Sequence, residues 1–253
     1  MTQMATGSLD TTGIAPLAHD EAQDLFMVEI TRTGELLRAL TAPDWSKQTD
    51  CPAWDVRRMY LHVLGAHESG ASMRELMHQL RAGARYRRTH GGPPHAALSA
   101  IQVREREHIT TPELLPRLER AGMAAARSRR RMPALMRAVR INADPDFDRW
   151  SLGYLNDTIY LRDLWMHRVD ASRATGRTMI LTAAHDGRIV ADIVAEWARR
   201  HGQPVSLKLT GTAGGTYVSQ GGGAPMTLDA IEFCRILAGR AGGDGLMATP
   251  VPF

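Results

Sequence analysis

Apolar residues recur every three or four positions through the first two thirds of the chain, which is the period of an amphipathic helix. The first such stripe predicts a helix from about residue 22 to residue 40. It comprises Leu25, Val28, Ile30, Leu36, Leu37 and Leu40. A second helix is expected to begin after Asp55, whose carboxylate can accept a hydrogen bond from a first-turn amide, and to continue towards Leu80.

Two further helical stretches follow. One runs from about residue 97 to residue 136 and is interrupted near residue 110, where Thr110 and Glu113 match a capping box. The other runs from about residue 151 to residue 175 and is stopped by Gly176. Four long amphipathic segments with polar connections between them predict a four-helix bundle.

After Gly176 the period changes. A helix is expected over residues 188–200, and Val205, Leu207 and Leu209 alternate with polar neighbours, which predicts a half-buried strand. Two short strands are expected at 216–219 and 226–228, and Asp229 can cap a last helix over 230–238.

The predicted fold class is therefore α+β. Residues 1–178 are expected to form the helical bundle, with residues 1–19 as a flexible lead-in. Residues 179–253 are expected to form a small α/β domain, which is marginal in size for independent folding.

Composition narrows the class of protein. The 253-residue chain is 43% hydrophobic and 23% charged, which is typical of a globular protein. No apolar run approaches the roughly 20 residues that span a bilayer, and the first residues lack the apolar core of a signal peptide, so a cytoplasmic protein is expected. The two cysteines, Cys51 and Cys234, exclude a disulfide framework and are expected to be reduced and buried.

The net charge of +4 raises the question of nucleic-acid binding. Much of the basic excess lies in residues 127–131, followed by Arg137 and Arg140. No aromatic residues are interleaved there and no nucleic-acid module is recognisable, so a solvated helix end is the favoured interpretation. The charge could also attract small anions to the surface.

Three potential metal ligands stand out: His62 in the second expected helix, and Asp163 and His167 in the fourth. A spacing of four residues places Asp163 and His167 on one helix face, about 40° apart. If the bundle brings His62 against them, three protein ligands with an open fourth position match a catalytic rather than a structural zinc-type site. Asp170 could then hydrogen-bond a ligating imidazole and fix its tautomer.

Simpler interpretations of these residues stay open. Asp163 and His167 could be a hydrogen-bonded pair within one helix, or could pair with a neighbouring arginine on a solvent-exposed face. His67 competes with His62, because five residues correspond to a rotation of about 140° and both cannot face the same ion. His62 is preferred, since it shares its side of the helix with the apolar stripe.

Three segments of the chain resemble parts of a known family. CPAWDVRRMYLHVLGAHE (51–68) resembles the C-P-x-W-x-V-x-D-x-x-x-H signature of the mycothiol-dependent maleylpyruvate isomerase family, within the DinB-like superfamily. YLRDLWMHRVDASRATGR (160–177) is similar to that family's second metal motif, E-L-x-x-H-x-x-D. MTLDAIEFCRILAGRA (226–241) is similar to its C-terminal domain, which has a sterol-carrier-like fold. The resemblance implies a DinB-like four-helix bundle followed by a small α/β domain.

The resemblance also implies roles for particular residues. The family's histidine ligands fall on His62 and His167, and its acidic ligand falls on Asp163, where the usual residue is the longer Glu. The family uses an arginine of the C-terminal domain near the substrate carboxylates; Arg240 is the best match and Arg235 the second, and each could also be an ordinary arginine at a helix end.

The implied cofactor is a divalent metal ion, Zn²⁺ first, with Ni²⁺ or Fe²⁺ also compatible with the ligand set. The implied co-substrate is mycothiol or another low-molecular-weight thiol, and the reaction is isomerisation of, or S-transfer to, a small anionic or electrophilic substrate. A non-catalytic small-molecule or lipid-binding protein on the same scaffold is the alternative function.

Overall fold

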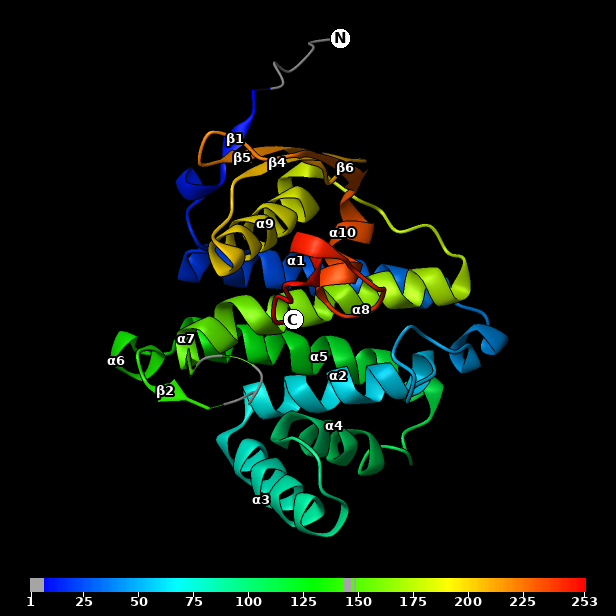
Figure 1. The fold of residues 1–253 in the computed structure, drawn as a ribbon. Coiled ribbons are helices and arrows are strands. Elements are labelled where there is room, and N and C mark those ends of the chain that lie inside the picture. The colour runs from blue at the N-terminus through cyan, green and yellow to red at the C-terminus, as the bar shows by residue number, and fades with distance from the viewer. Residues whose placement is uncertain (1–6, 143–146, 148) are drawn as a thin grey trace. The chain divides into compact units, whose positions relative to one another are not determined.

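Helices make up most of the chain, and the longer strands lie in its C-terminal part (Figure 1). The structure is a computed structural model that describes residues 7–142, 147 and 149–253. The helices are α1 (His19–Arg38), α2 (Val56–Ala71), α3 (Met73–His90), α4 (Pro94–Arg104), α5 (Thr111–Arg130), α6 (Ala134–Arg137), α7 (Leu152–Tyr154), α8 (Tyr160–Thr175), α9 (Arg188–His201) and α10 (Ala230–Leu237). The strands are β1 (Leu9–Asp10), β2 (Arg140–Ile141), β3 (Trp150–Ser151), β4 (Val205–Thr210), β5 (Gly215–Ser219) and β6 (Pro225–Asp229). The predicted α+β class is confirmed.

The described chain divides into two compact units. One is His19–Met179, which contains α1 to α8, and the other combines residues 7–18 with Ile180–Phe253. The N-terminal stretch therefore differs from the expected flexible lead-in, because β1 pairs in parallel with β5, with Leu9 opposite Tyr217. Residues 1–6 of that expectation lie outside the described residues.

The predicted four-helix bundle is formed by α1, α2, α5 and α8 (Figure 1). Its buried apolar side chains include Phe26, Met59, Tyr60, Leu64, Leu114, Leu118, Leu164 and Trp165. α3 and α4 pack on each other and on α2, and so form a helical hairpin added to the bundle. The apolar stripes predict the bundle helices, but they do not separate this hairpin from them.

Three helix starts predicted from capping residues are confirmed. Asp55 accepts a hydrogen bond from a first-turn amide of α2 at 2.7 Å. Glu113 accepts one from the Thr110 amide at 2.9 Å, which completes the capping box of α5. Asp229 caps α10 through a first-turn amide at 2.9 Å. Each carboxylate satisfies a donor that the helix itself leaves unpaired.

α2 ends earlier than the hydrophobic pattern predicts. Its last residue is Ala71, and Ser72 leaves the helical conformation at φ −141° and ψ 117°. The Ser72 hydroxyl then accepts a hydrogen bond from the Glu75 amide at 3.3 Å and starts α3. The single helix expected to reach Leu80 is therefore wrong, because a polar cap interrupts a stripe whose period hardly changes.

The fourth predicted helix is also interrupted. α7 passes into a π-helical turn at Leu155–Ile159 before α8 begins. The side-chain amide of Asn156 donates to the Leu152 carbonyl at 2.7 Å, next to this turn. Such π-helical turns are rare in proteins, and those that occur are often near functional sites. Apolar periodicity does not reveal them. The end of α8 at Gly176, with φ 70°, is as predicted.

In the C-terminal unit, the strand order of the sheet is β1-β5-β4-β6. β4 runs antiparallel to β5 and parallel to β6, and its Val205, Leu207 and Leu209 are buried while the residues between them are more exposed. α9 and α10 lie on one side of this sheet (Figure 1). Their aromatic rings meet edge to face, with 5.2 Å between the centroids of Trp197 and Phe233. This packing supplies the unit with its own apolar core.

The basic run at the end of α5 differs in one residue from the solvated helix end that the sequence predicts. Arg129 is only 1% exposed, whereas the neighbouring arginines of residues 127–131 are exposed. The Arg129 guanidinium lies over the rings of Phe26 and Tyr160, at 4.6 and 4.1 Å from their centroids. One cation of the run therefore belongs to the bundle interior.

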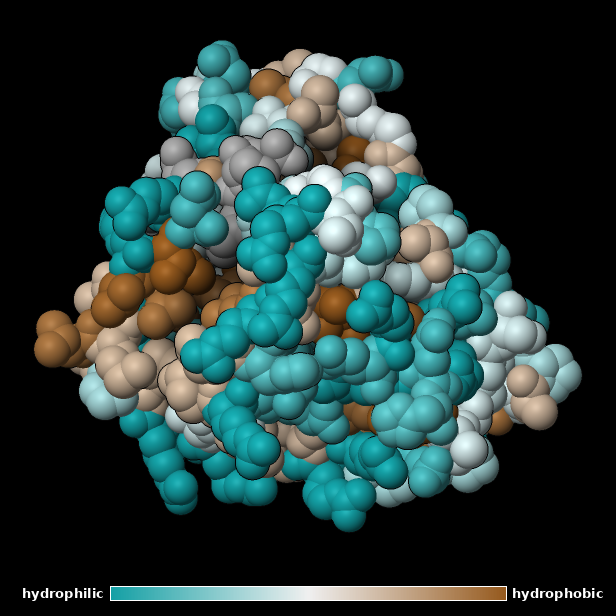
Figure 2. Space-filling view, turned by 90° about the horizontal axis from the view of Figure 1, so that it is seen from below, coloured by the Kyte–Doolittle hydropathy of each residue, from teal (hydrophilic) through white to brown (hydrophobic). Residues whose placement is uncertain are grey.

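The face of the molecule in Figure 2 is largely hydrophilic. Apolar side chains gather towards the side where α6 lies in Figure 1, and around α6 the exposed apolar residues are Leu135, Met136 and Val139. Among the described residues, no helix has both the length and the apolar character that crossing a membrane requires.

Candidate metal centre

The bundle brings the three predicted ligands together. His62 projects from α2, and Asp163 and His167 project from successive turns of α8. One donor atom of each residue lies within 4.8 Å of the donors of the other two. The same helix spacing that placed Asp163 and His167 on one face therefore presents both to His62.

The distances within this set suit a common ion. His167 Nε2 lies 3.2 Å from Asp163 Oδ1, and His62 Nε2 lies 3.9 Å from Asp163 Oδ2. Two ligands of a tetrahedral zinc ion stand about 3.3 Å apart when the metal–ligand bonds are about 2.0–2.1 Å. The shorter Asp side chain thus reaches towards both imidazoles, one with each carboxylate oxygen.

Burial distinguishes the members of the set. The His167 side chain is 3% exposed, whereas those of His62 and Asp163 are 12% and 24% exposed. His167 Nε2 is buried and has no hydrogen-bond partner among the described residues, although the Asp163 carboxylate lies beside it. A buried polar atom without a hydrogen bond costs free energy, and a bound cation would remove that cost.

The charges of Asp163 and His167 stabilise each other. Burial alone would raise the pKa of Asp163, but the nearby His167 and His62 outweigh it and hold that pKa well below its ordinary value. Burial would likewise lower the pKa of His167, but Asp163 and Asp170 outweigh it and raise that pKa well above the ordinary value. Without a metal ion, a proton on His167 therefore balances the carboxylate charge.

The other nitrogen of His167 faces a second group of polar side chains. Its Nδ1 lies 3.3 Å from Asp170 Oδ2, and the Cys51 thiol lies 3.5 Å from the same oxygen. Cys51, His167 and Asp170 also have donor atoms within 4.8 Å of one another, but all three are buried. This group lacks an open side, so it fits orientation of the His167 ring better than exchange of a ligand with solvent.

His62 is held from two sides. The Trp54 ring stacks on it, with 4.8 Å between centroids and 24° between planes. Its Nδ1 lies 2.7 Å from Oε1 of Gln102, a buried residue of α4. The opposite nitrogen, Nε2, faces Asp163.

His67, the competing histidine of α2, lies away from this set. Its Nδ1 contacts the Leu118 carbonyl at 3.3 Å, and its ring packs edge to face against Phe26. Burial and the nearby Arg129 lower the pKa of His67 to about 3, so it is neutral at ordinary pH. His67 thus has the character of a core histidine.

The two candidate arginines lie in the C-terminal unit. Arg235 is a buried residue of α10 and forms an ion pair with Glu232. Arg240 lies in the turn that follows α10, where its guanidinium donates to the Ala238 carbonyl at 3.3 Å. The charge of Arg235 is balanced within its own helix by Glu232.

The sequence does not predict that three further residues lie around the set: Cys51, Trp54 and Gln102. Cys51 and Trp54 are the C and W of the C-P-x-W motif, and that motif is the signal that could have identified them. Gln102 is a polar residue between Ile101 and Val103 in a buried part of α4. That position is a weak signal, because nothing in the local pattern links it to α2.

The cysteine prediction is confirmed, since Cys51 and Cys234 are both free and buried.

Comparison with solved structures gives the same fold. The crystal structure of a mycothiol-dependent maleylpyruvate isomerase matches with a TM-score of 0.57 at 12% sequence identity, and the match covers 97% of this chain and 100% of that one. The crystal structure of a mutant of such an isomerase, with a histidine replaced by alanine, matches with a TM-score of 0.55 at 13% identity and the same coverage. No curated protein sequence matches the chain.

A family model described as "Mycothiol maleylpyruvate isomerase N-terminal domain" matches residues 26–172. This range is more than half of the 253-residue chain, and it includes His62, Asp163 and His167. The chain therefore belongs to the mycothiol maleylpyruvate isomerase N-terminal domain family.

Proposed function

We propose that the protein is a metal-dependent enzyme in which His62, Asp163 and His167 bind one divalent cation. The observation that carries this proposal is the convergence of their donors within 4.8 Å, together with the buried His167 Nε2 that has no hydrogen-bond partner among the described residues. Two imidazoles and one carboxylate with a partly exposed side suit Zn²⁺, and Ni²⁺ or Fe²⁺ are the alternatives.

The proposed co-substrate is a low-molecular-weight thiol, with mycothiol as the first choice because the family description and the matched structures name it. A divalent cation held by the set would stabilise the thiolate form of a coordinated thiol near neutral pH. Asp170 orients the His167 ring through Nδ1, and Trp54 holds the ring plane of His62. The chain thus supplies the ligands and fixes their directions.

The proposed reaction is addition of the thiolate sulfur to an electrophilic carbon of a small substrate. In an isomerisation, the thiolate adds to a cis double bond conjugated to a carbonyl group, and the π electron pair moves onto the carbonyl oxygen as an enolate. The resulting carbon–carbon single bond rotates, and the enolate then expels the thiolate and restores the double bond in the trans arrangement. In an S-transfer, the carbon–sulfur bond is kept and a proton completes the product. Arg240 is proposed to bind an anionic group of the substrate through its guanidinium.

Metal analysis of the purified protein tests the site. Wild type is expected to retain about one equivalent of a divalent metal, and His62→Ala and His167→Ala are each expected to lose it. His67→Gln is the matched control, because it replaces a buried histidine of the same helix outside the set. Unchanged metal content in both alanine variants, or loss only in His67→Gln, would reject the site.

A turnover assay tests the reaction. Mycothiol consumption and product formation are followed with maleylpyruvate and a panel of small enones and epoxides. Turnover that requires His167 and falls in Arg240→Ala supports the proposal. Retained binding of apolar ligands without thiol-dependent turnover favours a non-catalytic binding protein.

A further inference from the structure

A line of buried amide side chains leads from His62 to the outer helices α3 and α4. Gln102 of α4 lies with Oε1 2.7 Å from His62 Nδ1, and its Nε2 donates to Gln79 Oε1 at 2.9 Å. Gln79 belongs to α3, and the two glutamines are 2% and 0% exposed. Burying an amide group costs folding free energy unless its donors and acceptors are hydrogen-bonded.

The direction of these hydrogen bonds is set at the outer end. Gln79 Nε2 donates to the Gly65 carbonyl at 2.9 Å and to Glu75 Oε1 at 2.8 Å. A carbonyl and a carboxylate can only accept, so the nitrogen of Gln79 must face them and its oxygen must face Gln102. Gln102 then donates with its nitrogen, and its oxygen is left to accept a hydrogen bond from His62 Nδ1–H.

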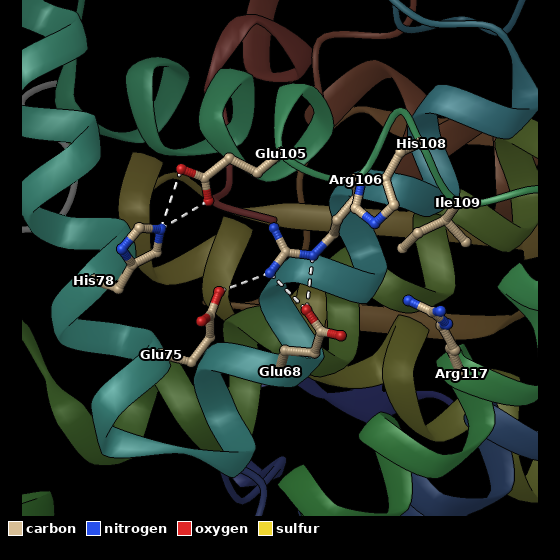
Figure 3. Close-up of a pocket in the computed structure, with 8 residues that line it drawn as sticks. All are labelled: Glu68, Glu75, His78, Glu105, Arg106, His108, Ile109 and Arg117. Atoms are coloured by element: carbon tan, nitrogen blue, oxygen red, sulfur yellow. Dashed lines mark hydrogen bonds and ion pairs between the residues drawn. The ribbon is translucent and has the colours of Figure 1, made fainter.

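Glu75 forms the outer end of this line, in a polar pocket on the surface of the helical unit (Figure 3). Arg106 donates to Glu75 Oε1 at 2.7 Å and to Glu68 Oε2 at 2.7 Å, and so bridges the two carboxylates. Burial would raise the pKa of Glu75, but the hydrogen bonds from Gln79 and Arg106 outweigh it and lower that pKa. The end group is therefore an ionised, acceptor-only carboxylate.

Gly65 permits the close approach that the line requires. A Cβ atom at Gly65 would lie 2.6 Å from Cβ and Cγ of Gln102, a separation that real Cβ atoms essentially never show. The absence of a side chain thus lets Gln102 lie directly against α2, while the Gly65 carbonyl anchors Gln79. One glycine supplies both the space and an acceptor.

We propose that Gln102, Gln79 and Glu75 are positioning residues that hold His62 as the Nδ1–H tautomer. In that tautomer the lone pair of Nε2 points towards Asp163 and His167, ready to bind a cation. The separation of 3.9 Å between His62 Nε2 and Asp163 Oδ2 agrees, because it is longer than a hydrogen bond. The role assigned to these three residues rests on the proposed metal site, whereas the tautomer itself does not.

The tautomer is measured directly in the metal-free protein. Long-range ¹⁵N–¹H spectra at about pH 8.5, above the ordinary histidine pKa of about 6.5, distinguish Nδ1–H from Nε2–H. The signals of His62 are assigned with His62→Gln. Wild type is expected to show Nδ1–H, and Gln102→Leu is expected to shift towards Nε2–H, because Asp163 is then the remaining acceptor near the ring.

Variants one step further out separate orientation from local damage. Gln79→Leu leaves Gln102 in place but removes the partner that fixes its direction, so a mixture of tautomers is expected. Gln23→Leu is the matched control, since Gln23 is also buried in this unit but donates to Asp157. Nε2–H in wild type, or an unchanged tautomer in both Gln102→Leu and Gln79→Leu, would overturn the proposal.

Metal affinity gives the second measurement. Competition with a coloured zinc chelator is expected to show about 10- to 100-fold weaker binding in Gln102→Leu and little change in Gln23→Leu. Equal affinity of Gln102→Leu and wild type would refute the positioning role. If wild type binds no zinc, the proposed metal site fails, and the tautomer spectra still decide whether the amide line orients His62.

Discussion

Two histidines on α2 have opposite surroundings within one bundle. His62 lies with Asp163 and His167, and its Nδ1 hydrogen-bonds to Gln102. His67, five residues later, packs against the Phe26 ring and contacts a backbone carbonyl. The same residue type is thus part of a polar site at one position and of the core at the other.

The charged groups nearby explain the difference. The carboxylate of Asp163 lies beside both His62 and His167, and its negative charge favours a cation bound between them. Near His67 the charge is the guanidinium of Arg129, which together with burial keeps the imidazole neutral. Burial is the larger cause that keeps His67 neutral, and the charge of Arg129 adds to it, so this histidine does not suit a cation.

The largest effect is expected from removing the carboxylate of Asp163, which lies beside His62 and His167. Asp163→Asn keeps the shape of the side chain but replaces an anionic ligand with a neutral amide. Metal affinity is expected to fall by more than about 100-fold, beyond the usual cost of losing an outer partner. Competition titration measures the change, and His67→Gln should stay within a few-fold of wild type. Comparable losses of metal affinity in Asp163→Asn and His67→Gln would mean that the surroundings of His62 and His67 do not differ in cation binding.

The surroundings of His67 predict how the free energy of unfolding depends on pH. His67 has a folded pKa of about 3, while an unfolded histidine titrates near about 6.5. The unfolded state therefore binds the extra proton, and stability falls as pH drops below about 6.5. The cost is about 1.4 kcal/mol per pH unit, or about 2 kcal/mol at pH 5.

Urea unfolding of wild type and His67→Gln at pH 7 and at pH 5 checks this dependence. The metal-free proteins are compared, so that loss of the metal does not contribute. The variant should lose less stability than wild type on acidification, by about 2 kcal/mol. Parallel losses in the two proteins would show that His67 is not the neutral core residue that its surroundings indicate.

The pH dependence of metal binding completes the contrast. Because the pKa of His167 is raised in the metal-free protein, binding of the cation must displace a proton from Nε2. Affinity is expected to weaken about tenfold for each pH unit below that pKa. Calorimetry in buffers with different ionisation enthalpies should detect about one proton released at pH 7. If no proton were released, the raised pKa of His167 would be contradicted. As a control, His67→Gln should release the same number of protons as wild type.

Much of the fold could be predicted from local patterns. Apolar periodicity located the bundle helices, and Asp55, Thr110 and Asp229 marked starts that depend on a side chain and its own helix. The break at Ser72 was missed, although Ser72 followed by Glu75 is a capping pattern. The apolar stripe continues past this cap with little change of period, so periodicity alone predicts one helix there.

The candidate site was predictable only in part. Asp163 and His167 share a helix face, so their spacing alone brings them together, and the family motif connects them with His62. Burial of Arg129 and the line from His62 to Glu75 depend on contacts between helices. Glutamine at position 102 becomes informative only when Gly65 of another helix lies against it.

The smallest expected effect tests whether direction or charge matters at the outer end of the amide line. Glu75→Gln removes a carboxylate, but the Gly65 carbonyl still accepts from Gln79 Nε2 and keeps both amides in the same direction. Zinc affinity should therefore fall by less than about tenfold, below the loss expected for Gln102→Leu. Competition titration compares the two variants. An equal loss in both would mean that the charge of Glu75, rather than the direction of the amides, prepares His62 for a cation, because Arg106 keeps its contact with Glu68 in either case.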